Sequence, residues 1–141
     1  MNELANAMVF CVIEFRLDPA SGRAVYLQLT HQVRQALRMG RLRAGDQLPT
    51  AREVGARLGI TSNTVLKAYR ELELRGLVVG RTGVGTFVVD PLPGGAVEVP
   101  PQLRHDLERW LAEARAAGLD EESVDALLAT TRDQLATESV A

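Results

Sequence analysis

Two short helical segments separated by a four-residue turn constrain this chain more than any other part of its sequence. The first opens with the letters TARE, in which the Thr50 hydroxyl can accept from the backbone amide of Glu53 while the Glu53 side chain reaches back. Gly59 ends this helix, since glycine readily takes the left-handed conformation at a helix terminus. The second helix begins at Thr61 or Ser62, whose hydroxyls suit an N-cap. This order predicts a helix-turn-helix.

The flanking segments complete a small domain. Upstream, apolar positions at intervals of three and four predict an amphipathic helix over 25–39 that stops at Gly40. Downstream, 77–81 and 86–89 are short β-prone runs around a glycine-rich turn, which predicts a hairpin. Residues 9–15 are β-branched and aromatic enough for a further strand. Three helices followed by a hairpin form the winged helix-turn-helix plan, so the predicted fold class is mostly α with a small β-hairpin (α+β).

A segment rich in proline and glycine follows at 91–101. Its letters PLPGGAVEVPP hold four prolines and two glycines, which excludes a helix interior and predicts a linker between an N-terminal domain at 1–90 and a helical tail at 102–141. The two tail helices are too short to close a core alone, so they must pack on the first domain or on another subunit. Another subunit is the expected cover, which makes the tail a dimerisation segment. The residues expected in that interface are Leu103, Leu107, Trp110, Leu111, Leu127 and Leu128.

Charge is divided unevenly along the chain. The whole sequence has a net charge of −2, yet residues 1–90 carry 12 Lys and Arg against 8 Asp and Glu, whereas residues 91–141 carry 4 against 10. A basic segment joined to an acidic one is typical of a polyanion-binding surface beside a segment with another task. The alternative is an ordinary solvated surface.

Composition also limits the chemistry. Cys11 is the single cysteine and the two histidines are widely separated, so neither an internal disulfide nor a metal site is expected. No nucleophile has a paired base and no phosphate-binding glycine pattern occurs, so we expect neither an enzyme nor a cofactor. The apolar run at 8–13 is too short for a membrane span and is flanked by glutamates. We therefore expect a cytoplasmic protein with no membrane partner.

The motif order over Val25 to Asp90 resembles the DNA-binding domain of GntR-type bacterial transcription regulators. The resemblance rests on G-D-x-L-P-T-x-R-E, then the helix-turn-helix, then R-G-L-V and G-x-G-T-F-V. The short tail is similar to that of the YtrA-like subgroup, whose two tail helices serve dimerisation. The resemblance implies a homodimeric regulator, expected to be a repressor, on a roughly palindromic double-stranded DNA operator. A small-molecule effector of unknown identity stays open, and the alternative function is a protein-interaction module without specific DNA readout.

The resemblance also implies residue roles. An arginine in the first turn of the second helix lies near a base edge or phosphate, the third helix enters the major groove, and the wing follows the minor groove or backbone. Many relatives carry basic residues where Ser62, Leu66 and Val84 stand, so those contacts are not carried over. The residues expected to bind DNA are Thr50, Arg52, Ser62, Asn63, Thr64, Lys67, Arg81, Thr82, Gly83 and Gly85.

Ordinary structural roles are the alternatives for several of these residues. Thr50 can serve only as the cap of its helix, and one residue at the start of the third helix can likewise serve as a cap. Arg52 then forms a surface ion pair with Glu53 or Asp46. Tyr69 is expected in the core by its spacing.

Overall fold

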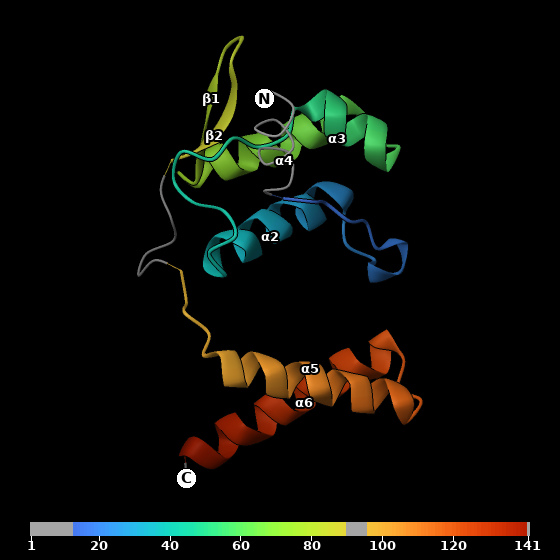
Figure 1. Ribbon diagram of the computed structural model, residues 1–141. Helices are drawn as coiled ribbons and strands as arrows, with labels where there is room; N and C mark the ends of the chain where they lie inside the picture. The colour runs from blue at the N-terminus through green and yellow to red at the C-terminus, as the bar shows by residue number, and fades with distance from the viewer. Residues whose placement is uncertain (1–12, 90–95, 141) are drawn as a thin grey trace, which may run out of the picture. The chain divides into compact units, whose positions relative to one another are not determined.

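The computed structural model describes residues 13–89 and 96–140 (Figure 1). The chain divides into two compact units, Met1–Glu98 and Val99–Ala141. We call the first the winged unit and the second the tail unit, and each is described by itself.

The capping signals of the sequence set the helices of the winged unit. The Glu53 amide donates to Thr50 Oγ1 at 3.1 Å and the Thr50 amide donates to Glu53 Oε2 at 3.2 Å, so the predicted capping box is present. Gly59 ends the same helix with φ +70°. Thr61 is the cap of the next helix, and its hydroxyl accepts from the Thr64 amide at 3.4 Å. The elements are η1 (Pro19–Ser21), α2 (Val25–Arg38), α3 (Ala51–Leu58) and α4 (Ser62–Leu74).

The predicted hairpin is confirmed as the wing. It consists of β1 (Val78–Arg81) and β2 (Gly85–Val88), paired antiparallel and joined through Gly83, whose φ is +75°. The other edge of β2 is also engaged, because Gln47 forms an isolated bridge with Phe87. Figure 1 shows the hairpin projecting beyond the helices of its unit.

One apolar core lies beneath these elements. Helices α2 and α4 pack on each other, and α3 packs on α4. Leu42 and Leu48 come from the loop between α2 and α3, so this loop is anchored in the core. Full burial of a Val or Leu side chain stabilises a fold by about 1.5–3 kcal/mol, which makes this cluster the main stabilising feature of the unit. The largest fully buried side chains are Leu29, Leu37, Leu42, Leu48, Leu72, Val33 and Val65.

The strand predicted at 9–15 is not found where the structure describes it. Residues 9–12, which include the single cysteine, lie outside the described part of the chain, and 13–15 belong to no strand. The residue directly after this segment, Arg16, is bound by a side chain of α2 and not by another strand. Gln32 accepts from the Arg16 amide at 2.9 Å and donates to the Arg16 carbonyl at 2.6 Å, so it occupies both backbone groups of this residue. The apolar side chains of 13–15 are nevertheless buried in the core.

The tail unit consists of two helices, α5 (Pro101–Ala116) and α6 (Glu121–Val140). Helix α5 begins at the last residue of the segment predicted as a linker, because proline is well tolerated in the first turn of a helix. The Asp120 carboxylate accepts from the Ser123 amide at 2.8 Å at the start of α6. None of the described helices combines the length and the apolar character that crossing a bilayer requires.

Candidate nucleic-acid interface

The first two turns of α4 present polar groups to solvent. Because the apolar side of this helix is buried in the core, Ser62, Asn63 and Lys67 are exposed. Thr64 is half-buried, and its hydroxyl lies 3.0 Å from the Thr61 hydroxyl, so part of its hydrogen-bonding capacity serves the helix cap. These two turns therefore offer hydroxyl, amide and ammonium groups of the kinds that recognise base edges.

Lys67 has a neighbour that the sequence patterns do not reveal. Its Nζ lies 4.1 Å from the ring centroid of Tyr26, in the first turn of α2. A cation over an aromatic face gains about 0.5–1 kcal/mol at an exposed site. Tyr26 is not among the predicted site residues, and its one sequence signal is an aromatic ring at the start of a helix. The contact holds the ammonium group beside the exposed face of α4.

Arg52 is exposed in the first turn of α3. Among the ion pairs of the described residues, none involves Arg52, so the predicted alternative of a surface pair is not found. The two candidate partners are engaged elsewhere: Glu53 accepts from the Thr50 amide, and Asp46 Oδ2 accepts from the Arg43 amide at 2.7 Å. The guanidinium is therefore available to an external anion.

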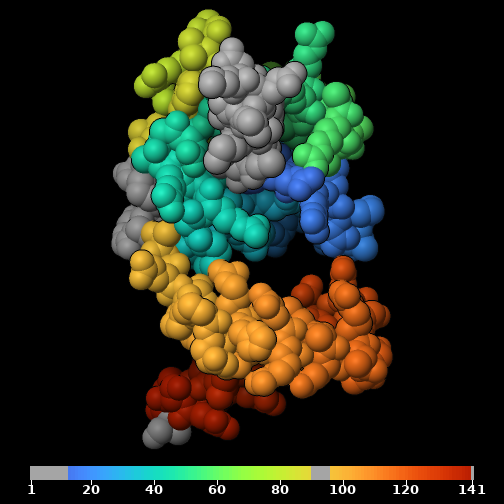
Figure 2. All heavy atoms as spheres, viewed as in Figure 1, coloured from blue at the N-terminus to red at the C-terminus, as the bar shows by residue number. Residues whose placement is uncertain are grey.

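The wing carries the remaining predicted contacts. Three of its four predicted residues are exposed and Gly85 is half-buried. The Arg81 Cζ atom lies 5.3 Å from the ring centroid of Phe87. Thr50 and residues 80–86 line one shallow, open depression, so the start of α3 adjoins the wing tip. Figure 2 shows the wing standing out from the surface of its unit.

A buried hydrogen bond ties the start of α3 to α4. Tyr69 is buried, as its spacing predicts, and its hydroxyl donates to the Pro49 carbonyl at 2.5 Å. Burial, with a smaller contribution from the negative charge of Glu53, raises the pKa of the Tyr69 phenol well above its ordinary value. The phenol therefore keeps its proton at neutral pH. Pro49 directly precedes Thr50, the cap of α3. The bond therefore joins the start of α3, which carries Thr50 and Arg52, to α4, which carries the other predicted DNA contacts of the helices.

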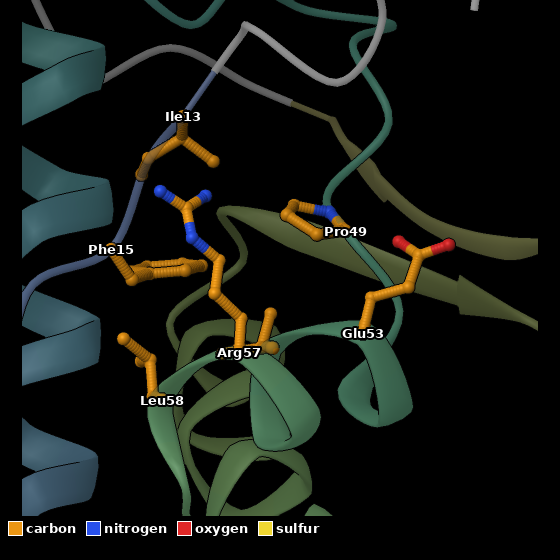
Figure 3. Close-up of a pocket in the computed structure, with 7 residues that line it drawn as sticks. Ile13, Phe15, Pro49, Glu53, Arg57 and Leu58 are labelled. Atoms are coloured by element: carbon orange, nitrogen blue, oxygen red, sulfur yellow. The ribbon is translucent and has the colours of Figure 1, made fainter.

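A cavity of about 270 Å³ lies on another side of α3 (Figure 3). None of the residues predicted to bind DNA lines this cavity. Arg57, which reaches over it from α3, forms an ion pair with Glu14. Among residues 13–89 and 96–140, no group of three His, Cys, Asp or Glu side chains is arranged to hold a metal ion. The apolar lining residues are Ile13, Phe15, Pro49, Val54 and Leu58.

The residues predicted for dimerisation lie on both tail helices and are largely open in the single chain. Trp110 and Leu128 are half-buried. The exposed fractions of the others are 60% for Leu103, 50% for Leu107, 38% for Leu111 and 42% for Leu127.

Comparison with known proteins identifies the relatives of this chain. The family described as "Bacterial regulatory proteins, gntR family" matches residues 25–88. The HTH-type transcriptional regulator Rv1152 of Mycobacterium tuberculosis is 36% identical over 104 residues, a match that covers 74% of this chain and 82% of that protein. The HTH-type transcriptional repressor YtrA of Bacillus subtilis is 30% identical over 110 residues, which covers 77% of this chain and 85% of that protein.

A solved structure shares the fold. The crystal structure of a transcriptional antiterminator from Listeria monocytogenes EGD-e has a TM-score of 0.55 and 25% identity, covering 85% of this chain and 90% of that chain. The matched family segment runs from the start of α2 to the end of β2, which contains every residue predicted to bind DNA. These matches confirm the family resemblance of the sequence motifs, and the chain belongs to the gntR family of bacterial regulatory proteins.

Proposed function

We propose that this chain is a homodimeric, sequence-specific transcription repressor that binds a roughly palindromic operator in the bacterial cytoplasm, on the nucleoid when bound. The observation that carries the proposal is the exposed face of the first two turns of α4, where Ser62, Asn63 and Lys67 face solvent. The name of the Bacillus subtilis relative supports repression as the mode of regulation.

Each exposed group suits a particular part of a DNA duplex. In the major groove, the Asn63 amide can bond both hydrogen-bonding groups of an adenine edge, and the Lys67 ammonium can donate to guanine. Leu66, which is 42% exposed, suits the methyl group of thymine. Arg52 at the start of α3 suits a base edge or a phosphate, and Arg81 on the wing suits a phosphate, a contact that orients the domain without reading sequence.

The charge of the winged unit supports a polyanionic partner. Residues 16–81 carry 12 Lys and Arg against 5 Asp and Glu. Four of these acids already bind backbone amides of the fold: Asp18 that of Ala20, Asp46 that of Arg43, Glu53 that of Thr50, and Glu73 that of Gly80. The surplus positive charge attracts the phosphate backbone and makes binding depend on salt concentration.

Two copies of the chain are needed for useful specificity, because one recognition helix reads only a few base pairs. The tail unit is the proposed source of the second copy, since its exposed leucines need an apolar cover. A twofold dimer would then place two α4 helices in successive major grooves, about 34 Å or 10 base pairs apart.

Selection of bound duplexes from a random DNA pool tests the proposal, with the full chain as the selecting protein. We expect an enriched site made of two inverted half-sites about one helical turn apart. Binding to that site should weaken linearly on a logarithmic salt scale, with a slope of about −0.9 per phosphate contacted. Absence of any enriched sequence would favour the protein-interaction alternative, and a single unrepeated half-site would contradict the homodimer.

A further inference from the structure

The base and the tip of the wing are held in different ways. At the base, the backbone of the loop before α3 pairs with β2: the Leu48 amide donates to the Thr86 carbonyl at 2.8 Å, and the Val88 amide donates to the Asp46 carbonyl at 2.8 Å. This backbone pairing stops at Thr86. On the β1 side, the Gly80 amide donates to a Glu73 carboxylate oxygen of α4 at 3.2 Å. The base is therefore fixed to the helical body from both edges.

The tip has one tie from outside the hairpin among the hydrogen bonds of the described residues. Gln47 Nε2, on the loop before α3, donates to the Val84 carbonyl at 3.1 Å. The turn is otherwise closed by its own bond from the Val84 amide to the Arg81 carbonyl at 3.0 Å. The side chain of Gln47 thus extends the support of β2 beyond the point where the backbone pairing ends.

A glycine makes room for this tie. A Cβ atom built on Gly85 would lie 2.4 Å from Gln47 Nε2, which is closer than two such atoms can approach, and Gly85 has φ +143°. The Gln47 side chain therefore passes directly over the backbone of the wing tip, where a side chain at position 85 would displace it. The fit couples position 47 of the G-D-x-L-P-T motif to Gly85, the first residue of β2.

We propose that Gln47 is a positioning residue that holds the wing tip in place for DNA contact and relates it to the start of α3. The inference rests on the proposed function, because it assigns the residue that orients a part of the same surface. Gln47 lies three residues before Thr50, the cap of α3, and Thr50 lines one depression together with the wing residues 80–86. The tie therefore connects two parts of the surface that are 37 residues apart in sequence.

Substitution Gln47→Met tests the tie, because methionine keeps the length of the side chain and loses the donor. Backbone ¹⁵N relaxation of the full chain without DNA is the first measurement. Order parameters of residues 82–85 should fall from about 0.85, the rigid range, toward about 0.6, while those of α4 stay unchanged. The control Gln35→Met makes the same replacement at an exposed position of α2 and should leave the wing unchanged. Unchanged order at 82–85 in Gln47→Met would overturn the proposal.

A double-mutant cycle on DNA separates positioning from direct contact. With a duplex selected by the full chain, Gln47→Met should weaken binding about two- to tenfold, the range of one neutral hydrogen bond. In an Arg81→Ala background, where the wing tip has lost its charged contact, the same substitution should have little further effect. An undiminished effect in that background would mean that Gln47 contacts DNA itself and would overturn the proposal. Failure of the chain to bind any DNA would refute the proposed function, whereas the relaxation measurement would still decide the role of Gln47.

Discussion

The winged unit and the tail unit bury their apolar residues to very different extents. Of the seventeen buried hydrophobic residues in the described chain, sixteen belong to the winged unit and one, Ala114, belongs to the tail unit. Helix α6 has 20 residues and no buried side chain at all. The winged unit therefore carries a core of its own, whereas the tail unit has apolar side chains that are still open to solvent.

The difference indicates which unit depends on a partner. A fully buried Leu contributes about 1.5–3 kcal/mol, so the core of the winged unit offsets the entropy of ordering its own chain. Two helices in which five of the six leucines are 38–60% exposed do not gain this stabilisation alone. We therefore expect the winged unit to fold without a second subunit, and the tail unit to be stable only when it associates with one.

Removing one tail leucine should have the largest effect. Leu107→Ala truncates a side chain that is 50% exposed in the single chain. A core truncation costs about 2–5 kcal/mol, and a twofold interface loses the side chain twice. We expect sedimentation equilibrium to show a shift from dimer to monomer at micromolar concentration. The neighbouring exposed residue gives the control, since Glu108→Ala should leave the association unchanged. An equally tight dimer in Leu107→Ala would mean that another surface joins the subunits.

Removing a core leucine of the winged unit should lower its own stability instead. Leu29 is fully buried between α2 and the rest of the core, so Leu29→Ala should reduce the free energy of unfolding by about 2–5 kcal/mol. Urea unfolding followed by circular dichroism measures the loss. Leu74→Ala, at a position that is 83% exposed, should change the same quantity by less than about 0.5 kcal/mol. Equal losses in both variants would contradict the assignment of a self-contained core.

The contacts proposed for DNA lie only in the winged unit and should change affinity without changing assembly. Asn63→Ala and Lys67→Ala should each weaken binding to a selected duplex by about 1–3 kcal/mol, the usual worth of a good base contact. Arg75→Ala is the matched control, because Arg75 lies at the other end of α4 and pairs with Glu71 at 3.5 Å. If Arg75→Ala weakens binding as much as the other two variants, charge alone explains the affinity and the readout by α4 is wrong.

Local signals predicted the helices and the wing well. The capping box at Thr50 and Glu53, the glycine at 59 and the apolar spacing of α4 each act within four residues, so the chain needs no tertiary information to show them. The candidate DNA surface on α3, α4 and the wing follows from the same motifs. Its residues are exposed in the structure except Thr64 and Gly85, which are half-buried, and its contacts with DNA stay a prediction.

The sequence did not predict the contacts that polar side chains make with residues far away in the chain. Gln32 occupies the backbone of Arg16, directly after the segment 9–15 predicted as a strand, and a glutamine inside an amphipathic helix gives no sign of this. The Gln47 tie to the wing and the Tyr26 contact with Lys67 are of the same kind. Each depends on two residues that the fold brings together, and neither has a period or a cap that a pattern could reveal.

The smallest expected effects are changes of stability with pH, at alkaline pH in the winged unit and at acid pH in the tail unit. In the winged unit, the raised pKa of Tyr69 means that its stabilising contribution is fully present below its ordinary pKa of 10.0 and declines as the pH rises beyond that value toward the folded-state pKa. Tyr69→Phe removes the bond to the Pro49 carbonyl, which should cost about 0.5–1.5 kcal/mol at neutral pH. In urea unfolding above pH 10, the free energy of unfolding of the variant should therefore fall less steeply with pH than that of the wild type. An identical decline in both proteins would exclude Tyr69 as its source.

The tail unit should respond at the acid end instead. Hydrogen bonds from Ser123 hold the pKa of Asp120 below its ordinary value of 3.8, so the contribution of this cap is present above that value and is lost as the pH falls through the lower folded-state pKa. Trp110 is the single tryptophan and lies in α5, so its fluorescence follows the tail unit alone. Asp120→Asn keeps an N-cap without the charge. In this variant the Trp110 fluorescence should change less at acid pH than in the wild type. A change in Trp110 fluorescence at alkaline pH that Tyr69→Phe abolishes would show that the two units unfold together, which would end the distinction between them.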